Sequence, residues 1–371
     1  MCKIKTNYAD TRYELNIYPA FKSNNIPVVF ETSRLFLPYL GVAIQSIVDK
    51  STAKYNYDIV IFSAELISED YKKLELLSNK KENISIRVFD PTNLVSRYIE
   101  TAKYQYLTLN YYRMSLPWIL KWYKQVINLG ADVLIKRDIG DLFYTETDPD
   151  AYIGGVIDIG YQGRLALDIS SKELGLKKPD GYINADVLLL NLENIRKSFE
   201  QEAVMQSWQA RFFRCAEQDA MNYLFQDHIY HFDPRWNVFP ERMSSEFDIL
   251  HAPTSSIEIW KQSLDDPYII HYAALPKPWQ LPSVGFGSDW WCTAKRTPYF
   301  EEIFQNMILY MRENISLDAV NTGSKGISNR WFPRGSLRRT FITLLVPKGS
   351  RRWCFLKKLQ YKVDRHRHRC I

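Results

Sequence analysis

The first sixty residues contain a strand, a helix and a second strand, and this order restricts the fold more than any other feature of the chain. The apolar runs at 26–30 (IPVVF) and 58–62 (DIVIF) predict two buried strands. Between them, apolar residues from Leu37 to Val48 recur at helical spacing. Two strands joined by one such helix form a right-handed unit with parallel strands. The sequence therefore predicts an α/β fold around a parallel sheet.

The next segments extend this pattern. A charged helix is predicted at 68–80, with Ser68 as the N-cap of a capping box, and a strand follows at 84–89. The stretch 110–124 has helical spacing with a proline inside it, and it leads into a strand at 125–129. These elements predict that strands and helices continue to alternate through the first third of the chain.

The remainder of the chain has weaker periodicity. A buried strand is predicted at 187–190. The region 242–262 indicates irregular structure, and 263–300, which is rich in Pro, Gly and Trp, indicates an ordered cap rather than a regular layer.

The strand predicted at 125–129 ends at Gly130-Ala131-Asp132. In open α/β sheets, ligands bind beyond the carboxyl ends of the strands. Asp132 is therefore the first candidate for a site residue. A solvated carboxylate at a strand end is the structural alternative.

Charge is unevenly distributed along the chain. The formal net charge is +6, yet residues 331–371 alone hold 12 Lys and Arg against one Asp. The other residues together are mildly acidic. A basic segment attached to an acidic body favours an anionic partner for that segment.

Apolar and aromatic side chains lie among the basic ones of 331–371, including Phe341, Leu345 and Trp353. Such a segment fits the interface of an anionic membrane, where each Lys or Arg contributes about 1 kcal/mol. A solvated basic tail is the alternative. Nucleic acid is not expected as a partner, because the acidic body offers no extended basic groove.

The cellular location is predicted from cysteines and apolar runs. The five cysteines include no CxxC pair, which favours a reducing compartment. Neither an 18-residue apolar run nor an apolar segment in the first 25 residues occurs, so we expect no spanning helix and no signal peptide. We therefore expect a cytoplasmic protein, held peripherally at the inner face of the membrane.

Separated motifs between residues 26 and 290 follow one another in a specific order. They are 28–42 (VVFETSRLFLPYLGV), 111–114 (YYRM), 129–135 (LGADVLI), 182–192 (YINADVLLLNL), 217–222 (EQDAMN) and 271–279 (HYAALPKPW). Each motif is weak alone. In this order and spacing, the chain resembles glycosyltransferase family 8, which includes lipooligosaccharide galactosyltransferases and glycogenin.

The resemblance implies the GT-A fold, a Rossmann-like sheet with a carboxylate pair at a strand end, over residues 26–300. It also implies transfer from a UDP-sugar with retention of anomeric configuration. On this division, residues 1–25 form a polar leader, and 301–371 form a helical, basic segment that associates with a membrane.

The resemblance further implies a metal and diphosphate site. A departing diphosphate gathers negative charge, which a divalent cation or basic side chains must neutralise. By correspondence, Asp132 and His271 bind the metal, Mn²⁺ or Mg²⁺, and Lys277 meets a phosphate. Arg113 orients the donor or the carboxylates. A core histidine and ordinary ion-pair partners are the structural alternatives for these residues.

The same correspondence assigns residues to the sugar. Asn184 and Gln218 face the reacting sugar beside Ala185, and Glu217 holds sugar hydroxyl groups. Glu217, Gln218 and Asp186 are the candidate catalytic residues. The structural alternative for Glu217 and Gln218 is an ordinary position near the start of a helix.

The sequence departs from the family pattern at the metal and the diphosphate. Gly130 stands in place of the first carboxylate of the metal pair, and Asp186 stands in place of a small glycine. Ala274 replaces a glycine whose backbone approaches the pyrophosphate. We therefore expect weaker binding of a divalent cation, because the number of charged ligands sets the affinity.

The nucleoside end departs as well. Ser33, Leu35 and Phe36 occupy positions where the family usually has Asp, Asn and Tyr. Ser33 and Phe36 remain donor-binding candidates, but the carboxylate that reads uracil is absent.

These departures leave three hypotheses open. The chain is a metal-poor enzyme that uses Asp186 and basic side chains, an enzyme with an altered donor, or an inert relative that acts as a binding or scaffold partner of an active transferase. The leading expectation is a hexosyltransferase that moves a hexose from a nucleotide sugar to a glycan or lipid-linked acceptor, such as a surface polysaccharide.

Overall fold

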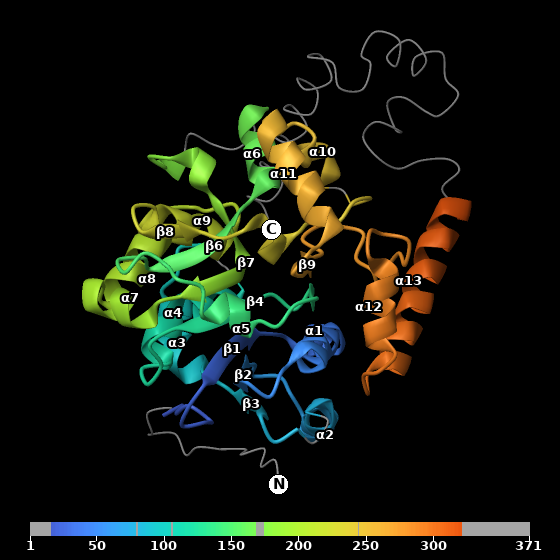
Figure 1. Cartoon of the computed structure of the whole chain (residues 1–371), viewed down its shortest axis with the longest axis horizontal. Helices are drawn as coiled ribbons and strands as arrows, with labels where there is room; N and C mark the ends of the chain where they lie inside the picture. Colours follow the sequence, from blue (N-terminus) through green and yellow to red (C-terminus); the bar gives the residue numbers. More distant parts are fainter. Residues whose placement is uncertain (1–15, 79–80, 105–106, 168–173, 244, 321–371) are drawn as a thin grey trace.

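The computed structural model describes residues 16–320, apart from 79–80, 105–106, 168–173 and 244 (Figure 1). The basic segment 331–371, with its expected contact to a membrane, lies outside the described residues. No helix in the part that is described is long and apolar enough to cross a bilayer.

Seven strands form the central sheet. In spatial order they are β3 (Ile84–Phe89), β2 (Asn56–Phe62), β1 (Asn25–Glu31), β4 (Val126–Leu129), β7 (Ile183–Leu190), β6 (Ile153–Ile157) and β8 (Ile229–His231). The first four run parallel, β7 is antiparallel to both β4 and β6, and β8 is parallel to β6. This confirms the predicted α/β fold with a mostly parallel sheet.

The predicted strand, helix and strand at the start of the chain are β1, α1 (Leu37–Lys50) and β2. Their parallel register runs from Asn25 opposite Asn56 to Glu31 opposite Phe62. Each strand is buried over six consecutive residues, which explains why the sequence shows continuous apolar runs there. α1 packs against α12 (Gly287–Ala294) and α13 (Phe300–Val320), as Figure 1 shows.

Helices cover both faces of the sheet. Val28 and Phe30 of β1 belong to the core cluster under α1, whereas Val29 belongs to the cluster on the other face. That second cluster is formed with α3 (Thr92–Glu100), α4 (Thr108–Ile119), α7 (Leu192–Ser198), α8 (Gln201–Gln209) and α9 (Ala216–Phe225).

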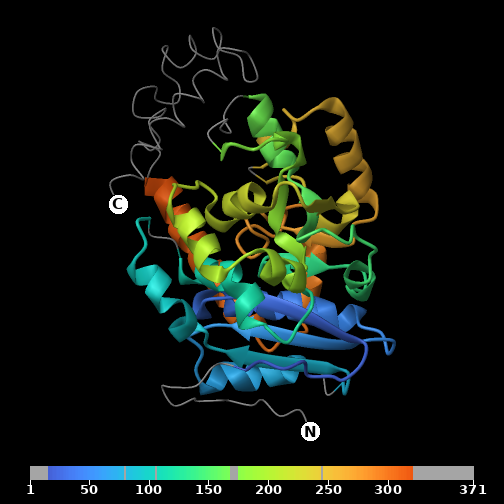
Figure 2. The ribbon, with the colours of Figure 1, turned by 90° about the vertical axis from the view of Figure 1, so that its left-hand side faces the viewer.

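The remaining helices are shorter or peripheral. They are α2 (Ser68–Leu77), α5 (Gly140–Phe143), α6 (Ile159–Ala166), α10 (Glu246–Ile249), α11 (Thr254–Asp265) and the 3-10 turns η1 (Arg34–Phe36), η3 (Pro179–Gly181) and η4 (Pro234–Asn237). In Figures 1 and 2, α6, α10 and α11 lie together at the end of the molecule opposite β2 and β3.

A second, small sheet positions the C-terminal half of the site. β5 (Val133–Ile135) pairs antiparallel with β9 (Ile269–His271), and Val133 lies opposite His271. The backbone nitrogen of Tyr272 donates to the carbonyl oxygen of Asp132 at 3.0 Å. Residues more than 130 positions apart in the sequence are therefore neighbours.

Several local predictions were wrong. The region 242–262 is not irregular, because α11 forms there around the buried Trp260, which donates to Phe239. The cap predicted at 263–300 contains a regular strand, β9, and a helix, α12. Ile257, Trp260 and Leu264 of α11 pack on one small core at helical spacing, so the prediction overlooked a period that the sequence contains.

Two helix boundaries also differ from the prediction. The N-cap of α2 is Ile67 rather than Ser68, since Asp70 accepts a hydrogen bond from the Ile67 nitrogen at 2.9 Å. α4 ends at Ile119 rather than at 124, two residues after Pro117.

Candidate active site

The predicted site residues gather where β1 and β4 end and β7 begins. Glu31 is the last residue of β1, and Asp132 follows β4 by three positions. Because β7 is antiparallel to β4, its first residues lie beside the last residues of β4. The Gly130 nitrogen donates to the Asp186 carbonyl oxygen at 2.9 Å. Asp132 and Asp186 therefore meet at this edge of the sheet.

Asp132, Asp186 and His271 point toward one another. Nε2 of His271 lies 3.5 Å from Oδ1 of Asp132 and 3.5 Å from Oδ2 of Asp186. Ligand atoms on one ion, with bonds of about 2.1 Å, lie at most about 4.2 Å apart. The two separations from the imidazole meet this limit, and the ligand atoms of all three side chains lie within 4.8 Å of one another.

The burial of His271 supports the same conclusion. The side chain is fully buried, and its Nε2 has no hydrogen-bond partner among the described residues. An unpartnered buried polar atom costs free energy, which a bound cation would offset. The residues present therefore fit the metal that the sequence predicts.

Two asparagines hold the imidazole. Nδ1 of His271 lies 2.9 Å from Oδ1 of Asn237, and Nδ2 of Asn237 donates to Oδ1 of Asn184 at 3.0 Å. Because the amide oxygen accepts, Nδ1 carries the proton and the lone pair of Nε2 faces the two carboxylates.

Each carboxylate is anchored through its other oxygen. Nζ of Lys277 lies 2.6 Å from Oδ2 of Asp132, and a guanidinium nitrogen of Arg113 lies 3.0 Å from Oδ1 of Asp186. Burial opposes ionisation of Asp132, but the close polar contact with His271 and the charge of Lys277 hold the pKa of that carboxyl below its usual range. All three side chains are thus fixed at one end and direct the other end at a common point.

Arg113 organises the carboxylates around the site. It pairs with Glu31 at 3.2 Å, Asp186 at 3.0 Å and Glu217 at 3.1 Å, and it also donates to the Ala185 carbonyl oxygen at 3.2 Å. Burial alone would lower the pKa of Arg113, but the three carboxylates raise it. Burial raises the pKa values of both Glu31 and Glu217, since one guanidinium offsets only part of their desolvation.

The predicted sugar-facing residues form a hydrogen-bonded network beside this cluster. Oε1 of Gln218 accepts from the Ala185 nitrogen at 2.9 Å and from Nδ2 of Asn184 at 3.2 Å. Its Nε2 donates to the Tyr182 hydroxyl at 3.0 Å and to Asp158 at 3.3 Å. The structure therefore places Asn184, Ala185 and Gln218 together on β7 and α9.

Comparison of the sequence with known families shows which family the chain belongs to. Residues 27–281 match the sequence model of glycosyl transferase family 8, which is more than half of the chain. The chain belongs to glycosyl transferase family 8.

One curated relative in the family comparison is General stress protein A of Bacillus subtilis (strain 168). It is 23% identical over 292 residues, which cover 76% of this chain and 93% of the relative. At this identity, the relative supports the family without transferring its own properties.

Solved structures with the same fold include two glycosyltransferases. The bifunctional glycosyltransferase WbbM in its apo form has a TM-score of 0.73 and 22% identity, over 79% of this chain and 53% of WbbM. The galactosyltransferase LgtC, in complex with donor and acceptor sugar analogues, has a TM-score of 0.59 and 18% identity, over 74% of this chain and 96% of LgtC. The chain spans about half of the length of WbbM. These likenesses confirm the GT-A fold.

The residues predicted for the nucleoside in this family 8 chain follow the end of β1. Ser33 precedes η1, and Phe36 ends it with 43% of its surface exposed. Phe36 meets Tyr39 edge to face at 5.9 Å, and Tyr39 stacks on Trp279 at 4.0 Å. Trp279 lies two residues beyond Lys277, so aromatic contacts connect the nucleoside end to the phosphate end. Ala274 is half-buried against the core.

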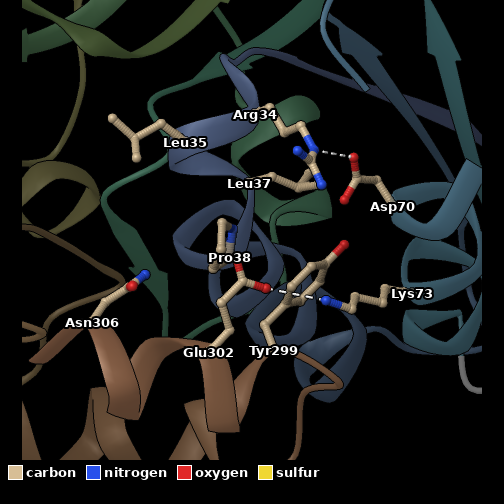
Figure 3. Close-up of a pocket in the computed structure, with 9 residues that line it drawn as sticks. All are labelled: Arg34, Leu35, Leu37, Pro38, Asp70, Lys73, Tyr299, Glu302 and Asn306. Atoms are coloured by element: carbon tan, nitrogen blue, oxygen red, sulfur yellow. Dashed lines mark hydrogen bonds and ion pairs between the residues drawn. The ribbon is translucent and has the colours of Figure 1, made fainter. Parts of the chain in front are cut away.

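A cavity of about 340 Å³ lies beside η1 between α1, α2 and α13 (Figure 3). Its charged side chains form two ion pairs, Arg34 with Asp70 at 2.8 Å and Lys73 with Glu302 at 3.1 Å. None of the predicted donor-binding residues lines this cavity. Leu35 of the nucleoside end lines this cavity, whereas the residues of the metal cluster do not.

Sequence reasoning missed two residues of this site. Glu31 ends the first buried strand, and the strand-end rule that selected Asp132 applies to it equally. Asn237 lies at the end of a four-residue 3-10 turn with no recognisable pattern, so its contact with His271 had no sequence signal.

Proposed function

We propose that this family 8 chain is an active hexosyltransferase, which moves a hexose from a UDP-sugar or another nucleotide sugar to a glycan or lipid-linked acceptor with retention. The observation that carries the proposal is the convergence of Asp132, Asp186 and His271, flanked by the cationic side chains of Lys277 and Arg113. A nucleotide sugar has a diphosphate that this combination suits.

The charge balance of the site supports a divalent cation, Mn²⁺ or Mg²⁺. Four carboxylates face two cationic side chains at this edge of the sheet: Glu31, Asp132, Asp186 and Glu217 against Arg113 and Lys277. The imidazole of His271 favours Mn²⁺, because Mg²⁺ prefers oxygen ligands. When bound, the cation supplies stabilisation of the charge that develops on the leaving diphosphate.

The chain's own residues supply binding and orientation. Lys277 lies beside Asp132, so its Nζ would exchange that carboxylate for a phosphate oxygen and hold the diphosphate. Arg113 fixes Glu217 and Asp186 at the sugar side, where carboxylates accept hydrogen bonds from hydroxyl groups. Gln218 and Asn184 form the adjoining polar wall.

An inert partner of another transferase is the alternative. In an inert protein, the departures at Gly130 and Asp186 would leave the site residues too far apart to share a cation. The separations of 3.5 Å from His271 to both Asp132 and Asp186 favour the enzyme instead.

The proposed acceptor rests on one solved structure and on the sequence. LgtC is a galactosyltransferase solved with donor and acceptor sugar analogues, which is consistent with a hexose donor and a sugar acceptor. The lipid-linked acceptor and the membrane contact of 331–371 rest on the sequence alone, as does the division of the chain at residues 25 and 300.

The test uses the purified full-length chain with UDP-, GDP- and dTDP-hexoses. We expect release of the nucleoside diphosphate with one donor class, loss of that release in EDTA, and recovery with Mn²⁺. No turnover together with no nucleotide binding in calorimetry would overturn the proposal. The anomeric configuration of the product, read by NMR, tests retention separately.

A further inference from the structure

We infer that Asp186 is a ligand of the cation, and that positions 130 and 186 form one ligand slot, which holds a single carboxylate from either strand. The inference rests on the proposed function for the presence of a cation. It goes further by stating which side chain binds the cation and why Gly130 is required.

Positions 130 and 186 are direct neighbours across two strands. Leu129 at the end of β4 lies opposite Val187 of β7, and the next two residues are joined by the hydrogen bond from Gly130 to Asp186. A Cβ built at position 130 would lie 3.0 Å from Cβ of Asp186 and 3.0 Å from Oδ1 of Asp132. Side chains at both positions therefore enter the same space.

That space accommodates one of the two side chains. A Cβ at position 130 would also lie 3.1 Å from Cγ of Asp186, a few tenths of an ångström closer than ordinary van der Waals contact, so Asp186 would have to shift. A second carboxylate there would add electrostatic repulsion to the steric overlap. The absence of a side chain at Gly130 therefore lets Asp186 keep the position in which Arg113 holds it.

Asp186 is oriented as a ligand rather than as a solvated surface group. Its Oδ1 is held by Arg113, which is buried and is itself held by Glu31. Its Oδ2 faces the buried, unpartnered Nε2 of His271 at 3.5 Å. The unpartnered nitrogen is an independent sign that a cation belongs between them.

Four proteins test the shared slot: the wild-type chain, Asp186→Gly, Gly130→Asp, and the double variant that carries both changes. Mn²⁺ affinity is measured from the EPR signal of free Mn²⁺, alone and with UDP, and thermal unfolding verifies that each protein is folded. Asp227→Asn is the matched control, because that carboxylate is 58% exposed and pairs with Lys177.

We expect Asp186→Gly to weaken Mn²⁺ binding by at least about tenfold, the loss that removal of a mere partner of a ligand already causes. Gly130→Asp should lower the unfolding temperature of the metal-free protein. The double variant should recover the unfolding temperature, and its Mn²⁺ affinity should return to within about threefold of wild type. In a double-mutant cycle this recovery appears as strong coupling between the two positions. The control should leave Mn²⁺ affinity unchanged.

The inference is overturned if Asp186→Gly binds Mn²⁺ like wild type, if the double variant binds no better than Asp186→Gly, or if the wild-type chain binds no Mn²⁺ with or without UDP. Because the readout is metal binding, its outcome is separable from that of the proposed function. If Mn²⁺ binding follows the carboxylate from position 186 to position 130 but no nucleotide sugar is turned over, only the proposed transferase activity is contradicted. Turnover with unchanged Mn²⁺ affinity in Asp186→Gly would contradict only the shared slot.

Discussion

The proposed metal end and the proposed nucleoside end of the site are built in opposite ways. At the metal end, Asp132, Asp186 and His271 lie on or beside β4, β7 and β9, and protein contacts hold each one. At the nucleoside end, Leu35 and Phe36 lie on the 3-10 turn η1 and are 74% and 43% exposed. Both ends depart from the family pattern. Strand pairing keeps the geometry at the first end, whereas the second end has no comparable framework.

This difference predicts that changes at the metal end affect turnover most. Asp132→Asn removes a charged ligand while keeping the shape of the side chain. A cation contributes several kcal/mol to stabilising the leaving diphosphate, so kcat/KM should fall by about 10³-fold in donor hydrolysis or transfer. Asp141→Asn, which alters a carboxylate 42% exposed beside Arg137, is the control. Equal activity of both variants would contradict the role of Asp132.

The next effect concerns folding stability. Arg113→Met leaves Glu31, Asp186 and Glu217 without their shared cation, and losing one partner of a buried ion pair costs about 3 to 5 kcal/mol. We expect that loss in the free energy of unfolding from urea titrations. Arg137→Met removes a guanidinium that is 47% exposed and should cost less than about 1 kcal/mol. Similar losses in the two variants would show that the carboxylate cluster does not depend on Arg113.

A smaller effect is expected at Asn237, which acts through His271. Asn237→Ala removes the acceptor that fixes the imidazole, and loss of such a partner weakens metal binding by about 10- to 100-fold. Mn²⁺ affinity from calorimetry measures this. If Asn237 were merely structural, the unfolding temperature of the metal-free protein would fall while Mn²⁺ affinity stayed the same.

The two ends also differ in how far the sequence predicts them. The strand-end rule selects Asp132 from the sequence, and the family resemblance adds His271 and Lys277. The adjacency of Gly130 and Asp186 depends on the register of β4 against β7, which the sequence does not state. Without that register, the missing carboxylate at position 130 and the additional carboxylate at position 186 look like two unrelated departures from the family pattern.

The fold shows the same division between elements with and without a repeating pattern. β1, α1 and β2 follow from continuous apolar runs and helical spacing, because each is buried along most of its length. The four-residue turn η4 is too short to show a period, although it carries Asn237. Asn237, which orients the proposed metal ligand His271, is therefore among the least predictable residues of the site.

The smallest effect is expected at the nucleoside end, where Phe36 offers an exposed ring. Stacking of a base on an aromatic side chain contributes about 1 kcal/mol or more, so Phe36→Ala should raise KM for the donor about fivefold. Since the base is remote from the breaking bond, the ring binds ground state and transition state alike, and kcat should not change. Phe36→Tyr, which keeps the ring, is the control and should retain KM. A fall in kcat at constant KM in Phe36→Ala would place Phe36 with the reacting groups and remove the distinction between the two ends.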